Sequence, residues 1–241
     1  MYGLGTLVNT GAVLVGGGAG LLFGKLLKER HQDTLRVADG VSVLFLAIAG
    51  TMEGMLRAEG QAIVSFNAMF VVICLVLGAL IGEIINIEGG FEKFGEWLKR
   101  KTGNSNDGNF LEGFVTTSLT ICIGAMTIIG SIEDGVYGNW TILGTKSILD
   151  LFMVMIMTAS LGKGCIFSAI PILVIEGGLT LLATAIKPLL TDAAMANISL
   201  IGNILIFCVG INLVWNRKIR VANFLPAVLI AAVAAFLPIS F

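Results

Sequence analysis

Three ionisable residues in the second half of the chain stand inside long apolar runs. Lys146 and Asp150 lie four residues apart in one run, and Glu176 lies in the next. Four residues is about one helical turn, so Lys146 can pair with Asp150 on one helix face. A charge at bilayer depth costs about 2.5–3.5 kcal/mol on insertion scales and marks a functional site by default. These residues are therefore candidates for binding a small polar solute, a cation or a proton.

The spacing places the two carboxylates at a similar depth. Asp150 stands 12 residues before an expected helix end at 162, and Glu176 stands 11 residues after an expected helix start at 165. These separations are about 18 and 16 Å at the helical rise, and a tight turn makes the two helices antiparallel neighbours. Asn203, on the following apolar run, is expected at a depth similar to that of the two carboxylates. Two alternatives remain. In one, a polar cavity contains both carboxylates, which bind the ligand. In the other, Lys146 and Asp150 form an internal pair and Glu176 is neutral.

The composition predicts an all-α polytopic membrane protein, with one transmembrane domain over 1–241. Hydrophobic residues make up 56% of the chain and charged residues 13%, with a mean hydropathy of +0.94. The apolar residues form blocks of about twenty, the length of a spanning helix. Eight spans are expected, at 4–26, 38–56, 63–86, 111–132, 143–162, 165–186, 196–215 and 221–239. The sixth is the weakest, because Glu176-Gly177-Gly178 suits a broken helix.

The basic residues predict the orientation of these spans. With the N-terminus outside, 12 of the 15 Lys and Arg residues fall in inner loops or at inner helix ends, as the positive-inside rule requires. An even number of spans then places both termini outside a bacterial plasma (inner) membrane. The inner set is Lys25, Lys28, Arg30, Arg36, Lys93, Lys99, Arg100, Lys101, Lys163, Arg217, Lys218 and Arg220.

A glycine pattern predicts close helix packing and an internal repeat. Gly16, Gly20 and Gly24 recur every four residues, so they form a groove for a neighbouring helix backbone. A shift of 58 residues places Asn9, Gly20 and Gly24 on Asn67, Gly78 and Gly82. The predicted repeat units are 4–56 and 63–135, followed by a second half at 143–241. Both asparagines are expected to join helices, and the groove leaves a homo-oligomer open.

An amphipathic insertion at about 88–103 interrupts the second repeat unit. Phe91, Phe94, Trp97 and Leu98 recur at helical spacing between charged residues. This pattern predicts a short helix on the inner membrane surface, with Trp97 at headgroup level.

Acidic residues also stand at the expected outer ends of two spans. Glu53 ends the second span, and Glu133 and Asp134 end the fourth. All three are expected to be hydrated.

Other chemistries find little support in the sequence. Cys74, Cys122, Cys165 and Cys208 form no CxxC pair, and His31 is the one histidine, so no metal site is indicated. No nucleophile stands at a meaningful spacing from a base, so the chain is not expected to be an enzyme and no cofactor is indicated. A net charge of −1 without a basic stripe argues against nucleic acid.

Three segments carry a resemblance to a known family: LGTLVNTGAVLVGGGAG, ERHQDTLRVADGVSVLFLAIAGTMEG and ASLGKGCIFSAIPILVIEGG. In these segments the chain resembles the uncharacterised prokaryotic multi-pass membrane proteins typified by YdfK and YqgA. The resemblance extends over essentially the whole chain and implies a bacterial plasma-membrane protein. It implies no activity, so no functional residue follows from it.

Two functions remain, and they predict different interiors. A small secondary transporter or ion-conducting protein requires a water-accessible cavity at Asp150 and Glu176. A membrane scaffold or regulator that does not transport requires a tightly packed centre and an exposed groove of small residues.

Overall fold

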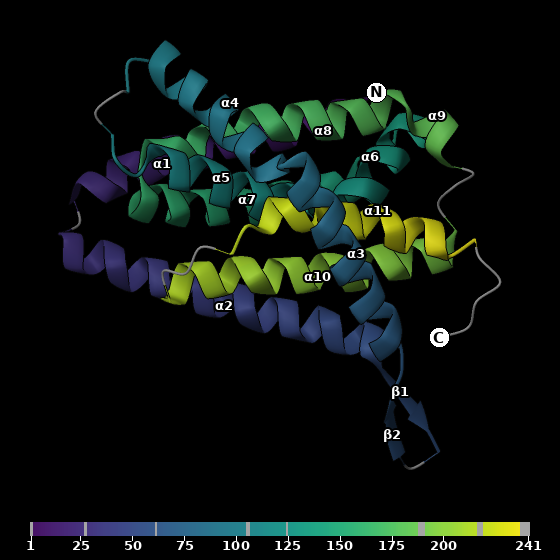
Figure 1. The fold of residues 1–241 in the computed structure, drawn as a ribbon. Coiled ribbons are helices and arrows are strands. Elements are labelled where there is room, and N and C mark those ends of the chain that lie inside the picture. Colours follow the sequence, from purple (N-terminus) through teal and green to yellow (C-terminus); the bar gives the residue numbers. More distant parts are fainter. Residues whose placement is uncertain are drawn as a thin grey trace.

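The computed structural model describes residues 2–26, 28–60, 62–104, 107–123, 125–187, 191–215 and 219–236. Nearly all of them are helical (Figure 1). The helices in chain order are α1 (Leu4–Leu26), α2 (Glu29–Met55), α3 (Ala68–Ile85), α4 (Ile87–Lys101), α5 (Phe110–Cys122), α6 (Ala125–Tyr137), α7 (Thr141–Leu161), η1 (Lys163–Ser168), α8 (Ala169–Leu181), α9 (Ala183–Ile186), α10 (Asp192–Trp215), η3 (Val221–Phe224) and α11 (Leu225–Ala234).

The polytopic helical class is confirmed, whereas the expected count of eight spans is not. Within the described residues, six helices are long and apolar enough to cross a membrane: α1, α2, α3, α7, η1 with α8, and α10. The expected fourth span is a pair, α5 and α6, bent by 62°, which brings the count to seven if it is taken as one span. The expected eighth span is a shorter apolar helix over Val221–Ala234, and the rest of that prediction, from residue 237, lies outside the described residues.

A β-hairpin occupies the place where the third span was expected to begin. Strands β1 (Leu56–Glu59) and β2 (Ala62–Ser65) pair antiparallel, with Leu56 opposite Ser65. The hairpin extends from the end of α2, away from the helices (Figure 1). Helix α3 therefore starts at Ala68 rather than at 63, because residues 62–65 are paired with β1.

The helix directions agree with a chain that crosses back and forth. Helices α1 and α7 are parallel, since Gly16 lies against Leu151 and Gly24 lies against Ala159. Helices α2 and α10 are antiparallel, because residues late in α2 meet residues early in α10. Odd-numbered spans of an alternating path share one direction, and α1 and α7 are the first and fifth of the expected spans. The side of the membrane on which each end lies remains a prediction.

Both glycine faces pack against a helix backbone. A Cβ atom added at Gly16 or Gly20 would lie 2.3 Å from a backbone oxygen of α7. Gly78 and Gly82 pack in the same way against the start of α11 and η3, but in the antiparallel direction. The glycine registers of α1 and α3 therefore match in sequence while their partners run in opposite directions. The internal repeat stays a prediction.

The buried polar residues gather in one half of the bundle. We call α1, α5, α6, α7, η1 and α8 the polar half; in the described part of the chain, Asn223 in η3 is the one buried polar residue outside it. The main apolar cluster instead centres on α10, where Leu205 packs among residues that include Phe70 of α3 and Ala227 of α11. The interior is thus divided by polarity, with α10 on the apolar side.

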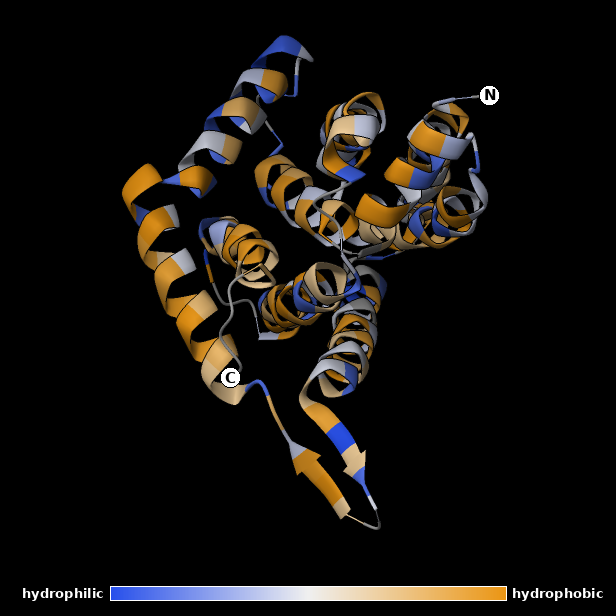
Figure 2. Ribbon diagram, turned by 90° about the vertical axis from the view of Figure 1, so that its right-hand side faces the viewer, coloured by the Kyte–Doolittle hydropathy of each residue, from blue (hydrophilic) through white to orange (hydrophobic). Residues whose placement is uncertain are grey.

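The surface of the bundle is largely apolar, as lipid contact requires. Large hydrophobic side chains such as Leu22, Phe45 and Ile84 are more than half exposed. In Figure 2, α3 is hydrophobic along nearly its whole length, while α4 alternates between hydrophobic and hydrophilic residues. Exposed apolar area on this scale is not a property of monomeric soluble proteins.

The segment expected to be an amphipathic helix is α4. Its Leu98 is buried and packs with Phe110 and Phe114 of α5, whereas Trp97 is 49% exposed. Trp97 stacks on Phe94, and the Lys101 ammonium lies 5.6 Å from the centre of its ring. The location of this helix on a membrane surface remains a prediction.

Candidate functional site

Four buried polar residues meet where α1, α7 and α8 converge. They are Asn9 of α1, Lys146 and Asp150 of α7, and Glu176 of α8, which we call the polar cluster. Asn9 and Glu176 are fully buried, while Lys146 and Asp150 are 6% and 7% exposed. The cluster therefore holds three ionisable side chains that are almost completely removed from solvent.

Direct hydrogen bonds and ion pairs connect the four side chains. Asn9 donates from Nδ2 to Asp150 Oδ2 at 3.0 Å and to Glu176 Oε1 at 2.9 Å. Lys146 Nζ pairs with Asp150 Oδ2 and lies 3.5 Å from Glu176 Oε1. Each carboxylate is thus in contact with both the amide and the ammonium, so the four residues form a single network.

The local sequence explains how α1 brings Asn9 to this point. Asn9 precedes Gly16 by seven residues, or two helical turns, so both lie on the same helix face. Gly16 and Gly20 let α1 approach the backbone of α7 closely, and the same approach brings Asn9 against Asp150. The sequence predicts that Asn9 joins helices. Its register with the glycines was the signal that it faces the same neighbour.

Helix α1 also changes the expected relation between the two carboxylate helices. The sequence predicted α7 and α8 to be direct neighbours, but the close backbone approaches are between α1 and α7 and between α1 and α8. Asp150 and Glu176 do come together, with Asn9 between them, and their depth in the membrane stays a prediction.

A second polar layer lies between the cluster and the start of α1. The hydroxyls of Thr6 and Thr180 lie 3.2 Å apart. Beyond them, the carboxylate of Asp134 accepts hydrogen bonds from the backbone N–H groups of Gly3, at 3.2 Å, and Gly5, at 2.9 Å. The expectation that Asp134 is hydrated is wrong, because it caps the N-terminus of α1 and is fully buried.

Several buried polar atoms in the polar half have no hydrogen-bond partner among the described residues. In the polar cluster these are Asn9 Oδ1 and Glu176 Oε2. The others in this half are the hydroxyls of Thr117, Ser118, Ser131 and Thr158. Buried polar groups are nearly always hydrogen-bonded in proteins, so such a concentration calls for an explanation.

Asn203 is not part of the cluster, although the sequence placed it there. It lies on α10, where its Nδ2 donates to the backbone oxygen of Ser199 at 2.8 Å. Its side chain also lies against Gly50 of α2. Depth along a helix axis does not fix the direction in which a side chain points, and α10 faces α2 here.

Asn67 lies at the beginning of α3 rather than on its glycine face. It has a left-handed backbone conformation, with φ at 63°, and its Nδ2 donates to the backbone oxygen of Gly54 at 3.1 Å. Asn67 thus joins the end of α2 to the start of α3. Asn9, its predicted counterpart in the repeat, binds two carboxylates instead.

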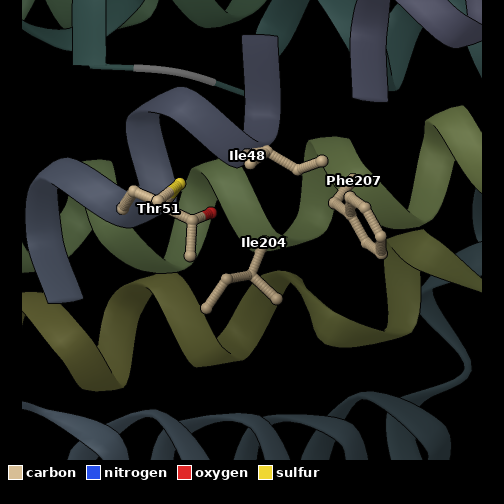
Figure 3. A pocket seen from close by; sticks show the side chains of 5 residues that line it. Ile48, Thr51, Ile204 and Phe207 are labelled. Carbon is tan, nitrogen blue, oxygen red and sulfur yellow. The ribbon is translucent and has the colours of Figure 1, made fainter. Parts of the chain in front are cut away.

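An apolar surface groove lies away from the cluster, between α2 and α10. It has a volume of about 240 Å³ and is lined by Ile48, Thr51, Met52, Ile204 and Phe207 (Figure 3). None of these residues belongs to the polar cluster. Asp150 and Glu176 are almost fully buried, at 7% and 0% exposure, and the water-accessible cavity expected beside them stays a prediction.

Comparisons with known proteins place the chain among membrane proteins without an assigned activity. Residues 4–236 match a family model described as "Protein of unknown function (DUF554)". The chain is 29% identical to the uncharacterized membrane protein YdfK of Bacillus subtilis over 96% of its own length and 95% of the relative. It is 32% identical to the uncharacterized protein YqgA of Escherichia coli, over 95% and 94% of the two chains. No solved structure matches.

Proposed function

We propose, from the premise that this chain belongs to the DUF554 family of membrane proteins, that it is a small secondary transporter or ion-conducting protein. Its working site in this proposal is the polar cluster of Asn9, Lys146, Asp150 and Glu176. The proposal contains no enzymatic step. The ligand is a small solute, a cation or a proton.

The observation that carries the proposal is the burial of three ionisable groups in one network. Lys146, Asp150 and Glu176 are at most 7% exposed, and each lies in a helix that is long and apolar enough to span a membrane. A packed hydrophobic interior of equal volume is often as stable as a buried ion pair, or more stable. Stability alone is therefore a weak reason for the cluster, and ionisable groups inside membranes typically belong to ion pathways and proton relays.

The distribution of polar groups supports the same proposal. The hydroxyls and amide oxygen without partners lie in the polar half, on α1, α5, α6 and α7. Groups of this kind can bind water or a passing ligand. The polar half thus contains buried polar atoms without partners both in the polar cluster and outside it.

The enclosed cluster sets a condition on this function. Transport requires the helices around the polar cluster to separate, since its members are buried on all sides. Transporters expose a site near the midplane to the two sides in turn. The arrangement described above corresponds to a closed state in such a cycle.

The packed centre is also the observation that favours the second candidate, a membrane scaffold or regulator. That function further requires an exposed groove of small residues, and the glycine faces do not provide one. Gly16, Gly20 and Gly24 are covered by α7, and Gly78 and Gly82 by α11 and η3. The exposed Trp97 and basic end of α4 remain available for a lipid surface in either case.

A flux assay in proteoliposomes tests the transport proposal. An imposed potassium diffusion potential drives ions, and internal dyes report H⁺ and Na⁺. We expect flux above that of empty liposomes for the unmodified protein, and reduced flux for Asp150→Asn and Glu176→Gln. Glu53→Gln is the matched control, because Glu53 is an exposed carboxylate at the end of α2. Equal flux in all four proteins would exclude the cluster from the mechanism, and flux at the level of empty liposomes would contradict ion conduction.

A further inference from the structure

The polar cluster contains more negative than positive groups. Lys146 supplies one positive charge, whereas Asp150 and Glu176 supply two negative charges if both are ionised. The described residues place no other basic side chain in the network. A fully ionised cluster therefore has a net charge of −1 on side chains that are at most 7% exposed. The inference below rests on the proposed function and names the ion that the cluster binds.

The hydrogen bonds show where this excess charge is least compensated. The Asn9 amide has two N–H donors, and its Nδ2 serves one carboxylate with each. Lys146 contacts Oδ2 of Asp150 and Oε1 of Glu176. Among the fully buried atoms of the cluster, two then remain without a donor, Glu176 Oε2 and Asn9 Oδ1. Both are acceptors, so what the cluster lacks is a hydrogen-bond donor.

Of the two carboxylates, Glu176 accommodates a proton more favourably than Asp150 does. Asp150 pairs directly with Lys146, one turn away on the same helix. Glu176 is fully buried, lies farther from the ammonium at 3.5 Å, and has a fully buried oxygen without a donor. A metal cation fits less well, because the ammonium would repel it and two oxygens fall short of the six or more that hard cations take.

The surroundings of Glu176 include few other groups that could exchange a proton. Helix α8 packs against α1, α5, α6, η1 and α9. From these elements the groups that face the cluster are Asn9 of α1 and the Cys122 thiol of α5, which is near enough to interact with all three charges. Asp134 of α6 lies in the outer layer and is engaged by two backbone N–H groups.

We propose that Glu176 holds the exchangeable proton of the cluster. A proton adds to Oε2 and converts the carboxylate to a neutral carboxylic acid, which leaves one Lys146–Asp150 ion pair and no net charge. Loss of that proton restores the carboxylate, and Lys146 can then neutralise either acidic group. The Thr6 and Thr180 hydroxyls stand one turn from Asn9 and Glu176, so they provide the first step of a route toward the start of α1.

Infrared difference spectroscopy of the protein in lipid tests the proposal without any transport measurement. A protonated carboxyl group gives a C=O stretch that a carboxylate lacks. We expect one such band at neutral pH, shifted in D₂O and lost in Glu176→Gln. It should persist in the control Glu53→Gln and weaken in Asp150→Asn, because Lys146 then has Glu176 as its remaining acidic partner. A band that is absent from the unmodified protein, or that disappears with Asp150→Asn and not with Glu176→Gln, would overturn the assignment.

A second measurement covers the case in which Glu176→Gln does not fold. Solid-state NMR of the unmodified protein, labelled with ¹³C at the glutamate carboxyls, should show one glutamate in the acid form at neutral pH. Glu176 is the one glutamate among the described residues that is buried. If all glutamates resonate as carboxylates, the proposal fails. A protonated Glu176 without any flux would retain this inference and refute transport, whereas flux with an ionised Glu176 would do the reverse.

Discussion

The close contact between α1 and α7 predicts opposite effects for two neighbouring glycine substitutions. A Cβ atom at Gly20 would lie 2.3 Å from the backbone oxygen of Met155 and 2.7 Å from Cβ of Thr158. A Cβ atom at Gly18 would meet nothing within 4 Å. Both glycines lie within α1, so Gly18→Ala is the matched control for Gly20→Ala.

The magnitude follows from the two terms that act at these positions. Replacing glycine with alanine inside a helix stabilises it by about 0.5–1 kcal/mol, and this gain applies to both variants. Adding an atom to a contact that is already closely packed costs about 1–3 kcal/mol. This cost applies to Gly20→Ala, because the backbone oxygen at the contact cannot rotate away. The gain cancels in the comparison, so Gly20→Ala should be about 1–3 kcal/mol less stable than Gly18→Ala.

Unfolding of the purified protein in mixed detergent micelles measures this difference. The midpoint for Gly18→Ala should equal or exceed that of the unmodified protein, and the midpoint for Gly20→Ala should fall below both. Gly16→Ala should behave like Gly20→Ala, since its Cβ atom would lie 2.3 Å from the backbone oxygen of Leu151. Equal midpoints for the variants at 18 and 20 would refute the close packing of α1 on α7.

Three further predictions concern charge, pH and orientation. Lys146→Met should destabilise the protein by about 3–5 kcal/mol, as for a broken buried ion pair. Adding Asp150→Asn should recover much of this loss. A double variant that is no more stable than Lys146→Met would contradict the pairing of Lys146 with Asp150. Burial raises the pKa of Glu88, outweighing the hydrogen bond that it accepts from a backbone N–H. The folded state then binds this proton more tightly than the unfolded state, so stability should fall as the pH rises through the interval between the two pKa values; unfolding midpoints at several pH values should show this fall, and Glu88→Gln should reduce it. For orientation, a cysteine at Ala58 in the hairpin should react in whole cells with a thiol reagent that cannot cross the membrane. A cysteine at Lys93 in α4 should react with this reagent only after the cells are permeabilised. The opposite pattern would reverse the predicted topology.

The sequence predicted the membrane class and the meeting of Asp150 with Glu176 for physical reasons that act locally. Apolar runs of spanning length define the class, and positions along two helices joined by a tight turn define the depth. The four-residue spacing also predicted the pairing of Lys146 with Asp150. Each of these inferences depends on residues that are close in the chain.

The parts that the sequence did not predict depend on contacts between distant residues. Asn9 reaches Asp150 and Glu176 across 141 and 167 positions of the chain, and no local pattern reveals which helix a groove receives. Asp134 is buried for the same reason, because its partners are backbone groups 131 and 129 positions earlier in the chain. Asn203 was placed by depth alone, and its direction depends on the contact of α10 with α2.

The pairing of α1 with α7 has a consequence for the biosynthesis of the protein. Helix α1 is complete at Leu26, but the helix that covers its glycine face ends at Leu161. At about 5–20 residues per second, translation from Leu26 to Asp150 takes roughly 6–25 s, during which Asn9 has none of its final partners. The last of them, Glu176, emerges later still. The first helix to be made is thus among the last to be fixed in place, and the polar cluster closes only when most of the chain has entered the membrane.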